Sequence, residues 1–579
     1  MRFWAHSSRR SRFATLCVVA FFAATFLAFG GGMSSADADG YPDGNVNCID
    51  LSLIVAADYP VTWPSGFPFF QLNHHRRIGP SSPYNIDIVT IDPNTGTQMD
   101  VPPHSVSLPD SGLPTAGAYG TMFSDKAPVW QFCGEACVID VRDLMKGGEP
   151  GRSPLIGPQH VRQWEKEHRQ VGFGDIVLMR ADYSDQFFRP FPEGRRFIAD
   201  AIEGKYIAWP DPHPDCMTFL AQRGVLHVGT DSPSMGPIPD LAEPTHFAGL
   251  RHGMVFTEGA TNLSKLPTTG AFYCMLPPKH VGSPAIEGRA FAVPPGPLAT
   301  WLIKAARAKH VADLTVLLSE DLPVSWAGSG QMRHRQPYIK VEFPISGSSQ
   351  HTHIFDSHAG TNLVPPAYSL PPPGFDNTLY EPKYRQLLAE YETKYGKRGN
   401  SVVTTDKVDL SQTCGWARVI DVRSLVGSTS REQWPSSPEV TPAHIENYER
   451  EHGALHAGEI VIFASGHVDR TFRGLPEGDA CMRSPSEGRS EGWPAPGPEA
   501  ILYLAKKGIS CVATDGPTLG GVNPEKALMT YWMLGTQGMV GVEFLTGVLD
   551  LPARAYFIFA AVKIRDGHGG HGRAIALYQ

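Results

Sequence analysis

Four side chains of types that bind metals stand within eight residues of one another, at His351, His353, Asp356 and His358. Imidazole nitrogens and carboxylate oxygens are ordinary ligands of zinc and related ions. On an extended segment, alternate side chains share a face, which would place His351 with His353 and Asp356 with His358 on opposite faces. The pattern leaves two interpretations open, a metal site and a set of solvated polar side chains.

Other histidines stand in segments that look structural. The stretch 566–573 is rich in glycine and contains His568 and His571, which predicts a flexible loop more readily than a ligand cluster. The run from His74 to Arg77 predicts an exposed basic turn. The sequence contains no Walker loop, no dinucleotide-binding fingerprint after a strand and no nucleophile elbow. Nucleotide-dependent chemistry and serine hydrolase chemistry are therefore not indicated.

The elements that must position any site occur twice. Segments of the first half recur in the second at offsets of about 281 to 284 residues, and upstream at about 263. The matching pairs include Val138–Arg142 with Val419–Arg423, Trp164–His168 with Tyr448–His452, and Gly229–Pro233 with Ala513–Pro517. This period is far longer than that of solenoid repeats, so each copy can bury its own core. We therefore predict two homologous domains, 39–297 and 298–579, that form a covalent pseudo-dimer.

Within each copy, strand and helix patterns alternate, which favours an α/β fold. Strands are predicted at 85–91, 175–180 and 224–229, and helices at 157–168 and 215–222. The second copy repeats the helices at 441–452 and 498–507, and a helix at 298–309 joins the copies.

Composition narrows the class of protein. The chain has 579 residues, with 42% hydrophobic and 19% charged residues and a formal net charge of -8. An acidic chain without a basic patch is a poor nucleic-acid binder. The cysteines are not spaced as a disulfide framework, and a single bridge between Cys133 and Cys137 is the one pairing that the spacing would allow.

The N-terminus carries four arginines, an apolar run over 13–29 and small residues up to Ala38. This is the layout of a signal peptide over 1–38, which predicts a secreted, periplasmic or cell-envelope protein. An uncleaved membrane anchor is the alternative, because the apolar run is nearly long enough to span a bilayer.

The segment Asn94-Thr95-Gly96-Thr97-Gln98-Met99-Asp100-Val101-Pro102-Pro103-His104 resembles the signature H-x-G-T-H-x-D-x-P-x-H of the metal-dependent cyclase family, which includes bacterial kynurenine formamidase and isatin hydrolase. Matches to the strand at 138–142, to the turn at 230–233 and to 258–263 support the resemblance. It implies two tandem cyclase-like domains of β/β/α architecture.

The resemblance also implies a site. The family's signature Asp, its later His and a Glu twelve residues further on correspond to Asp100, His246 and Glu258, which would bind one divalent metal, with Zn or Mn expected. His104 corresponds to the proton carrier. The two early histidines of the signature are replaced by Asn94 and Gln98. We predict Gln98 as an additional ligand, Asn94 and Trp63 as substrate-binding residues, and Glu258 with His104 as catalytic residues.

The second copy departs further from the signature. Val364, Tyr368 and Tyr531 stand where the family has the Asp, the proton carrier and the later His, whereas His358 and Glu543 match the family's residues at their positions. Without a carboxylate at Val364 a metal has no central ligand. This indicates a pseudo-enzyme half that supports the first copy.

The function implied is hydrolysis of a small amide or cyclic amide, arylformamidase-like, with N-formylkynurenine or a related compound as substrate. The expected partners are a small-molecule substrate and the two domains for each other, without nucleic acid, and further oligomerisation stays open. The alternative is a catalytically inactive ligand-binding or structural protein. Whether Trp326 of the second copy reaches the cleft of the first is also left open.

Overall fold

The computed structural model describes residues 41–45, 47–64, 69–325, 338–345 and 348–579. The predicted signal peptide and Trp326 lie outside these residues. Residues 44–579 pack as one unit that contains both repeats. None of the helices in the described part of the chain is both long enough and apolar enough to cross a membrane.

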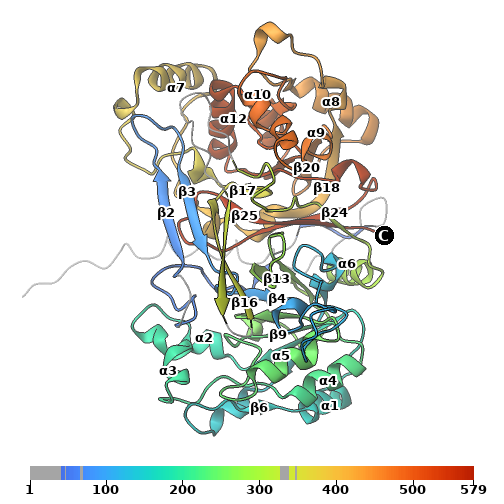
Figure 1. Ribbon diagram of the computed structural model, residues 1–579. Coiled ribbons are helices and arrows are strands. Elements are labelled where there is room, and N and C mark those ends of the chain that lie inside the picture. The colour runs from blue at the N-terminus through green and yellow to red at the C-terminus, as the bar shows by residue number, and fades with distance from the viewer. Residues whose placement is uncertain (1–40, 46, 65–68, 326–337, 346–347) are drawn as a thin grey trace, which may run out of the picture. The chain divides into compact units, whose positions relative to one another are not determined.

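The sheet of the first repeat has nine strands in the order β1-β13-β11-β5-β7-β9-β10-β4-β12 (Figure 1). Their bounds are β1 (Ile49–Asp50), β4 (Gln98–Asp100), β5 (Cys133–Asp140), β7 (Asp175–Arg180), β9 (His227–Thr230), β10 (Val255–Glu258), β11 (Phe272–Leu276), β12 (Ala285–Glu287) and β13 (Arg289–Val293). Strands β5, β7, β9 and β10 run parallel, and β4 is antiparallel to both β10 and β12. Only Gly288 separates β12 from β13, so the sheet curls back on itself and places β4 between β10 and β12.

Three helices carry apolar faces in this repeat: α1 (Pro158–Glu167), α4 (Pro214–Gln222) and α5 (Ala242–Leu250). Helices α4 and α5 pack together, and α1 packs on α4 and β5. Proline at the first position of α1 and α4 suits a helix start because that position needs no amide donor. The predictions at 157–168 and 215–222 are confirmed to within one or two residues. Two shorter helices are α2 (Tyr183–Phe187) and α3 (Ala199–Ile202). The strands β6 (Leu155–Ile156), before these helices in the sequence, and β8 (Asp211–Pro212), after them, pair as a parallel two-stranded sheet.

The second repeat builds its sheet in the same succession. The order is β14-β25-β17-β23-β22-β20-β18-β24, and β25 also pairs with β24. The bounds are β14 (Val311–Asp313), β17 (Asn362–Val364), β18 (Cys414–Asp421), β20 (Ile460–Ala464), β22 (Cys511–Thr514), β23 (Val540–Glu543), β24 (Tyr556–Ala561) and β25 (Gly570–Leu577). The long strand β25 pairs with both β17 and β24, as β12 and β13 together do in the first repeat.

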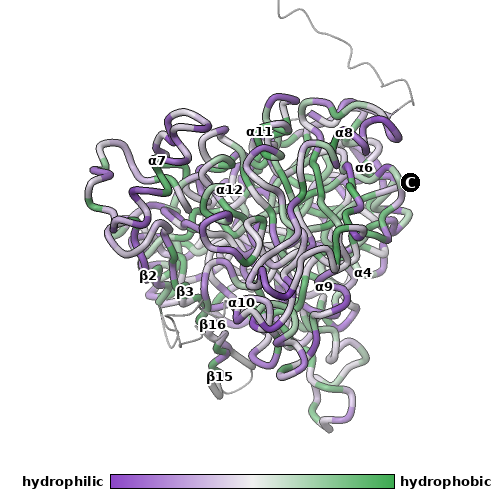
Figure 2. The backbone as a smooth tube through the Cα atoms, turned by 90° about the horizontal axis from the view of Figure 1, so that it is seen from above, coloured by the Kyte–Doolittle hydropathy of each residue, from purple (hydrophilic) through white to green (hydrophobic). Residues whose placement is uncertain are grey.

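The helices of the second repeat follow the same plan. They are α7 (Pro382–Tyr395), α8 (Pro442–His452), α9 (His467–Thr471), α10 (Arg483–Ser486), α11 (Pro498–Lys506) and α12 (Pro524–Thr536), with β19 (Glu439–Val440) paired to β21 (Ala495–Pro496). Helix α6 (Pro297–Arg307) joins the repeats, as predicted. Hydrophobic stretches gather in the interior of the tube in Figure 2, and hydrophilic ones lie mainly in peripheral loops and helices.

A four-stranded sheet takes one hairpin from each repeat. Its order is β15-β16-β3-β2, with β2 (Gln71–Arg76), β3 (Ile86–Ile91), β15 (Ile339–Ile345) and β16 (Ser348–Asp356). The central strands β3 and β16 are antiparallel, and Thr90 pairs with Ile354. In the repeat alignment of Asn94 with His358, Thr90 and Ile354 are matching positions. The two hairpins therefore meet at equivalent points, and the halves of the chain are joined by main-chain hydrogen bonds.

Two predictions for histidine-rich segments are wrong. The stretch 566–573 is not a flexible loop, because β25 begins at Gly570 and every residue of the strand is buried. A Cβ atom at Gly572 would lie 2.2 Å from the backbone oxygen of Ala560, so glycine permits the close approach of β24. The segment from His74 is not a turn but the strand β2, in which His74 Nδ1 lies 2.8 Å from Asp87 Oδ1.

The remaining pattern predictions concern His351–His358 and the cysteines. The four polar residues at 351–358 do not converge, because the ring of His353 lies near that of His280, with centroids 4.2 Å apart, whereas His358 lies against Tyr368 at 4.5 Å. All cysteines in the described residues are free, so the bridge between Cys133 and Cys137 is not formed. Cys133 instead pairs across the sheet with Cys274 of β11.

Candidate functional site

Asp100 lies at the end of β4, with β10 and β12 on either side. Its side chain is buried, and neither carboxylate oxygen has a hydrogen-bond partner among the described residues. A buried carboxylate without a partner is costly, because desolvation of the charge is not compensated. Asp100 is therefore where this site most needs a cation or a proton donor.

His246 of α5 and Glu258 of β10 complete the cluster. His246 Nε2 lies 3.3 Å from Asp100 Oδ2 and 3.2 Å from Glu258 Oε1. Its Nδ1 lies 2.8 Å from the carbonyl oxygen of Ala242 one helical turn earlier, which orients Nε2 toward the carboxylates. Two atoms that each bind a tetrahedral ion at about 2.0–2.1 Å lie roughly 3.3 Å apart. The distance from His246 Nε2 to each of the two carboxylates thus suits a metal ion shared with that carboxylate.

His104 approaches the same carboxylate from the short 3-10 helix Pro102–His104. Its Nε2 lies 3.6 Å from Asp100 Oδ2, and its ring centroid is 5.3 Å from that of His246. Asp100, His104 and His246 form a group whose potential ligand atoms all lie within 4.8 Å of one another. Burial and the neighbouring charge of His246 lower the pKa of His104 to about 4, so its imidazole is neutral near pH 7.

Electrostatic coupling distinguishes the other members of the site. Burial disfavours the protonated form of His246, but its contacts with Asp100 and Glu258 outweigh burial and raise its pKa well above the usual value. Burial, with the charge of Asp100, raises the pKa of Glu258. In the absence of a metal, an imidazolium between two carboxylates is therefore the way this site balances its charge.

Gln98, predicted as a ligand, forms a hydrogen bond instead of pointing freely into the site. Its Nε2 donates to Glu258 Oε2 at 2.7 Å, while the backbone N–H of Met235 donates to Oε1 at 2.5 Å. Both oxygens of Glu258 are thus held in place. Asn94, predicted to bind substrate, uses its side-chain amide in a turn, donating to Asp92 Oδ1 at 3.0 Å.

Trp63 is connected to the Asp100 cluster through Trp209 and Gly236. Its ring meets that of Trp209 edge-on, with centroids 6.2 Å apart, and Trp209 Nε1 donates to the carbonyl of Gly236 at 3.3 Å. A Cβ atom at Gly236 would lie 3.1 Å from His246 Cε1. Trp63 therefore supports the wall behind His246 through Trp209.

Sequence reasoning missed Asp211. This residue of β8 is buried, and neither carboxylate oxygen has a hydrogen-bond partner in the described ranges. Burial and the charge of Glu258 raise its pKa well above the ordinary value. The second copy has Ala495 at the matching position of β21, and this difference between the copies was the available signal.

The matching site of the second copy is filled by aromatic rings. Tyr368 and Tyr531 stand with centroids 5.2 Å apart, and Tyr84 of the first repeat stacks on Tyr368 at 4.8 Å. Tyr531 donates its hydroxyl to Glu543 Oε1 at 2.5 Å, and the Leu519 N–H donates to the same oxygen at 2.7 Å. The first repeat therefore contributes a side chain to the site of the second.

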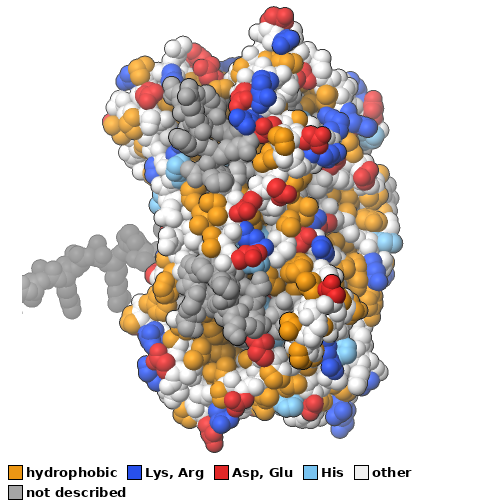
Figure 3. Space-filling view, in the orientation of Figure 1, with side chains coloured by type: hydrophobic (Ala, Val, Ile, Leu, Met, Phe, Trp, Pro, Cys, Tyr) orange, Lys and Arg blue, Asp and Glu red, His pale blue; other side chains and the backbone are white. Residues whose placement is uncertain are grey.

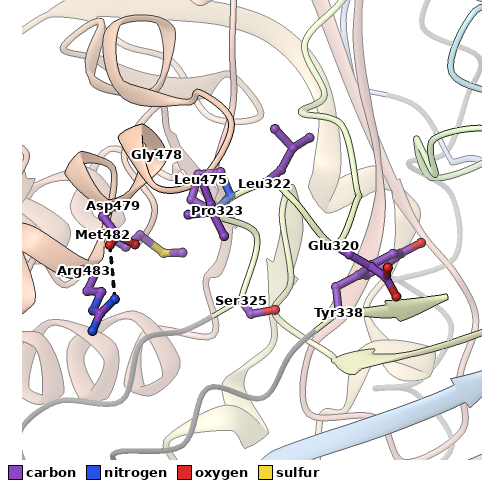
Figure 4. Close-up of a pocket in the computed structure, with 10 residues that line it drawn as sticks. All are labelled: Glu320, Leu322, Pro323, Ser325, Tyr338, Leu475, Gly478, Asp479, Met482 and Arg483. Atoms are coloured by element: carbon purple, nitrogen blue, oxygen red, sulfur yellow. Dashed lines mark hydrogen bonds and ion pairs between the residues drawn. The ribbon is translucent and has the colours of Figure 1, made fainter.

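The described surface also carries two open pockets away from this cluster. One, of about 60 Å³, is shown in Figure 4, with Tyr338 and Glu320 on one side and Asp479 and Arg483 on the other. The second, of about 170 Å³, lies between α7 and α11 and is lined by Tyr395 and Glu499 among others. Neither is lined by a residue of the Asp100 cluster. Figure 3 shows charges of both signs interspersed over one face, without an extended basic area.

Comparison with known proteins finds matches about as long as one repeat of this chain. A family model described as putative cyclase matches residues 49–237 and 312–520. Kynurenine formamidase of Salinibacter ruber is 28% identical over 246 residues, which cover 42% of this chain and 95% of that protein. Isatin hydrolase of Roseibium aggregatum is 28% identical over 268 residues, covering 44% and 93%. A crystal structure of an isatin hydrolase bound to the product analogue thioisatinate covers 44% of this chain and 94% of that one, at 20% identity and a TM-score of 0.37.

Proposed function

Because this chain belongs to the putative cyclase family, which matches it over both repeats, we propose that its first repeat is a metal-dependent hydrolase of a small amide or cyclic amide. The observation that carries the proposal is the buried carboxylate of Asp100, whose two oxygens have no hydrogen-bond partner in the part of the chain described. His246 and His104 stand 3.3 and 3.6 Å from it. Asp100, His246 and Glu258 would hold one divalent metal, Zn or Mn.

The residues divide the chemistry among them. When bound, the metal would lower the pKa of a water molecule and polarise a carbonyl group. His104, neutral near pH 7, accepts or returns a proton at Nε2 beside Asp100. Gln98 and the Met235 N–H orient Glu258, and burial with the charge of Glu258 raises the pKa of Asp211, which disfavours a further negative charge in the pocket.

The substrate class comes from the relatives. A kynurenine formamidase and an isatin hydrolase each match one repeat of this chain. Both names describe hydrolysis of a carbon–nitrogen bond on an aromatic amine, in an open formamide and in a cyclic amide respectively. We propose an arylformamidase-like activity on N-formylkynurenine or a related compound, in a protein that is secreted or located in the periplasm or cell envelope.

We propose that the second repeat is a pseudo-enzyme half. Val364 offers no carboxylate, and tyrosines occupy the space beside Glu543. The pairing of strand β3 from the first repeat with strand β16 from the second supports a covalent pseudo-dimer in which the second repeat stabilises the first.

The test compares two matched glutamates. Glu258 and Glu543 accept equivalent backbone N–H groups, from Met235 and Leu519, so Glu258→Gln and Glu543→Gln disturb the fold in the same way. We expect Glu258→Gln to lose bound metal and to lower kcat/KM for N-formylkynurenine or isatin by at least about 100-fold, because it removes a ligand. Glu543→Gln should keep both. Equal behaviour of the two variants, in metal content by elemental mass spectrometry and in turnover, would contradict the proposal.

One observation favours a second candidate, an inactive ligand-binding or structural protein. Both oxygens of Glu258 already have protein donors, and two family ligand positions are occupied by Asn94 and Gln98. Wild-type protein that contains no metal after incubation with Zn²⁺ and Mn²⁺, and that turns over neither substrate, would establish this alternative.

A further inference from the structure

A second cluster of metal-binding side chains lies where the two repeats meet. His280 follows β11, Glu287 ends β12 and His571 is near the start of β25, and all three side chains are fully buried. His571 Nε2 lies 3.0 Å and His280 Nε2 3.4 Å from Glu287 Oε1. The potential ligand atoms of the three residues all lie within 4.8 Å of one another. None of the three belongs to the signature that defines the Asp100 site.

The cluster depends on the duplication. Glu287 and His571 stand at matching positions of the two repeats, since β12 and β25 are equivalent strands whose partners are β4 and β17. Because Glu287 and His571 occupy matching positions and contact each other, they lie at the axis that relates the two repeats. One repeat supplies a carboxylate there and the other an imidazole, so the pair attracts, whereas two carboxylates would repel.

The hydroxyl of Tyr338 lies between ring nitrogens of two histidines and restricts which of these nitrogens carries a proton. The Tyr338 hydroxyl contacts Nδ1 of His280 and lies 2.6 Å from Nδ1 of His353. A hydroxyl has one proton, so it donates to one of these nitrogens, and the other histidine must donate its own Nδ1–H to the oxygen. A neutral histidine that donates from Nδ1 has a lone pair at Nε2. At least one buried Nε2 lone pair in this cluster therefore has no protein donor.

Several buried polar atoms of these residues have no hydrogen-bond partner in the described part of the chain. Within the described residues, Nε2 of His280, Nε2 of His353, Nδ1 of His571 and Oε2 of Glu287 make no hydrogen bond. His280 Nε2, although 3.4 Å from the carboxylate, is not aligned to bond with it. Buried polar groups are nearly always paired in folded proteins, so four unpaired atoms in one buried region indicate an additional ligand.

The residue types favour a cation as that ligand, because Glu287 offers carboxylate oxygens and His280 and His571 offer imidazole nitrogens within 4.8 Å of one another. A carboxylate with neutral imidazoles is a typical ligand set for Zn²⁺.

We propose that His280, Glu287 and His571 bind a divalent cation of the zinc type, and that this ion joins the two repeats. The separations of 3.0 and 3.4 Å agree with the roughly 3.3 Å expected between ligands of a tetrahedral ion. The site is structural, because its ligands are fully buried. Tyr338, which contacts His280, also lines the small pocket of Figure 4.

The test is carried out on the full chain with Asp100→Asn, which removes the central carboxylate of the Asp100 site. After incubation with Zn²⁺ and gel filtration, we expect about one zinc per chain by elemental mass spectrometry. His571→Gln in the same background should reduce this to less than about a tenth, because an amide can still donate to Glu287 but replaces the imidazole ligand. Its control is His227→Gln, which alters a buried histidine whose two nitrogens are already bonded to Gln131 and Thr257 and should leave the zinc in place.

A second measurement keeps the proposal testable if His571→Gln does not fold. Because the ligands come from both repeats, zinc should raise the thermal midpoint of the Asp100→Asn protein, and a chelator should reverse the rise. Absence of zinc from Asp100→Asn together with an unchanged midpoint would overturn the proposal. Zinc retained in full by a folded His571→Gln variant would also overturn it. These outcomes are independent of whether the Asp100 site hydrolyses amides.

Discussion

Two ion-pair triads should hold the repeats together, and each depends on one lysine from the opposite repeat. Asp50 is bound by Arg289 of its own repeat at 3.0 Å and by Lys563 of the other at 2.6 Å. Asp313 is bound in the same way by Arg573 at 2.6 Å and by Lys279 at 2.8 Å. The members of the two triads stand at matching positions. Lys279→Met and Lys563→Met should therefore each remove one of two equivalent contacts between the repeats.

The size of the effect follows from burial. Lys279 and Asp313 are each 18% exposed, which places their contact between the exposed pairs, worth about 0–1 kcal/mol, and the buried pairs, whose disruption costs about 3–5 kcal/mol. The carboxylate keeps its arginine after the change, so the charge left behind remains partly compensated. We expect a loss of about 2 kcal/mol in the free energy of unfolding for each lysine variant.

Urea unfolding followed by fluorescence would measure both variants, with the slope checked against wild type. Lys526→Met is the control, because its contact with Glu439 is 66% and 39% exposed and joins residues of the same repeat, and a loss below about 0.5 kcal/mol is expected. If Lys279→Met and Lys563→Met lose no more than this control, the triads do not hold the repeats together. A large loss from only one of them would contradict the equivalence of the two contacts.

Three further predictions concern single features. Burial would raise the pKa values of Asp50 and Asp313, but the bound Arg and Lys outweigh burial and lower these pKa values. The two carboxylates therefore stabilise the fold above the unfolded-state pKa of about 3.9, and this stabilisation is lost as pH falls through the folded-state values. Replacing both by Asn should reduce the dependence of the unfolding free energy on pH between about pH 5 and 3. Gly572→Ala should lower the yield of folded protein or its unfolding free energy by more than about 2 kcal/mol, because a Cβ there meets a backbone oxygen of β24 at 2.2 Å, and circular dichroism during urea titration would detect it. Tyr531→Phe should cost about 1–3 kcal/mol in the same titration without changing metal content, because it leaves Glu543 with one fewer donor in a site that we propose holds no metal.

Local patterns predicted the parts of the fold that local forces determine. Helices α1, α4, α8 and α11 begin at prolines and carry buried apolar faces, and each was predicted close to its true bounds. The glycine-rich segment before Arg573 was misinterpreted, because glycine usually marks a loop. Here its missing side chain lets β25 approach β24, which only the packed sheet reveals.

The candidate site divides in the same way. The resemblance placed Asp100, His246 and Glu258 together, and the structure brings them within hydrogen-bonding or ion-pairing distance. It could not give the bond from Gln98 to Glu258, because that contact depends on the register of β4 against β10. Asp211 was missed because its place beside Glu258 depends on how β8 packs, which a single aspartate before a proline does not encode.

Duplication within one chain explains how these features can differ between the halves. In a homodimer, a residue at the symmetry line meets its own copy, so a glutamate there would face a glutamate and repulsion would oppose burial. Fusion of the repeats removes that constraint, because Glu287 and His571 can change independently. The same freedom permits Asp100 in one site and Val364 with tyrosines in the other. A buried pair of unlike residues at matching positions is therefore a feature that the fused chain can hold and that a symmetric pair of identical chains cannot.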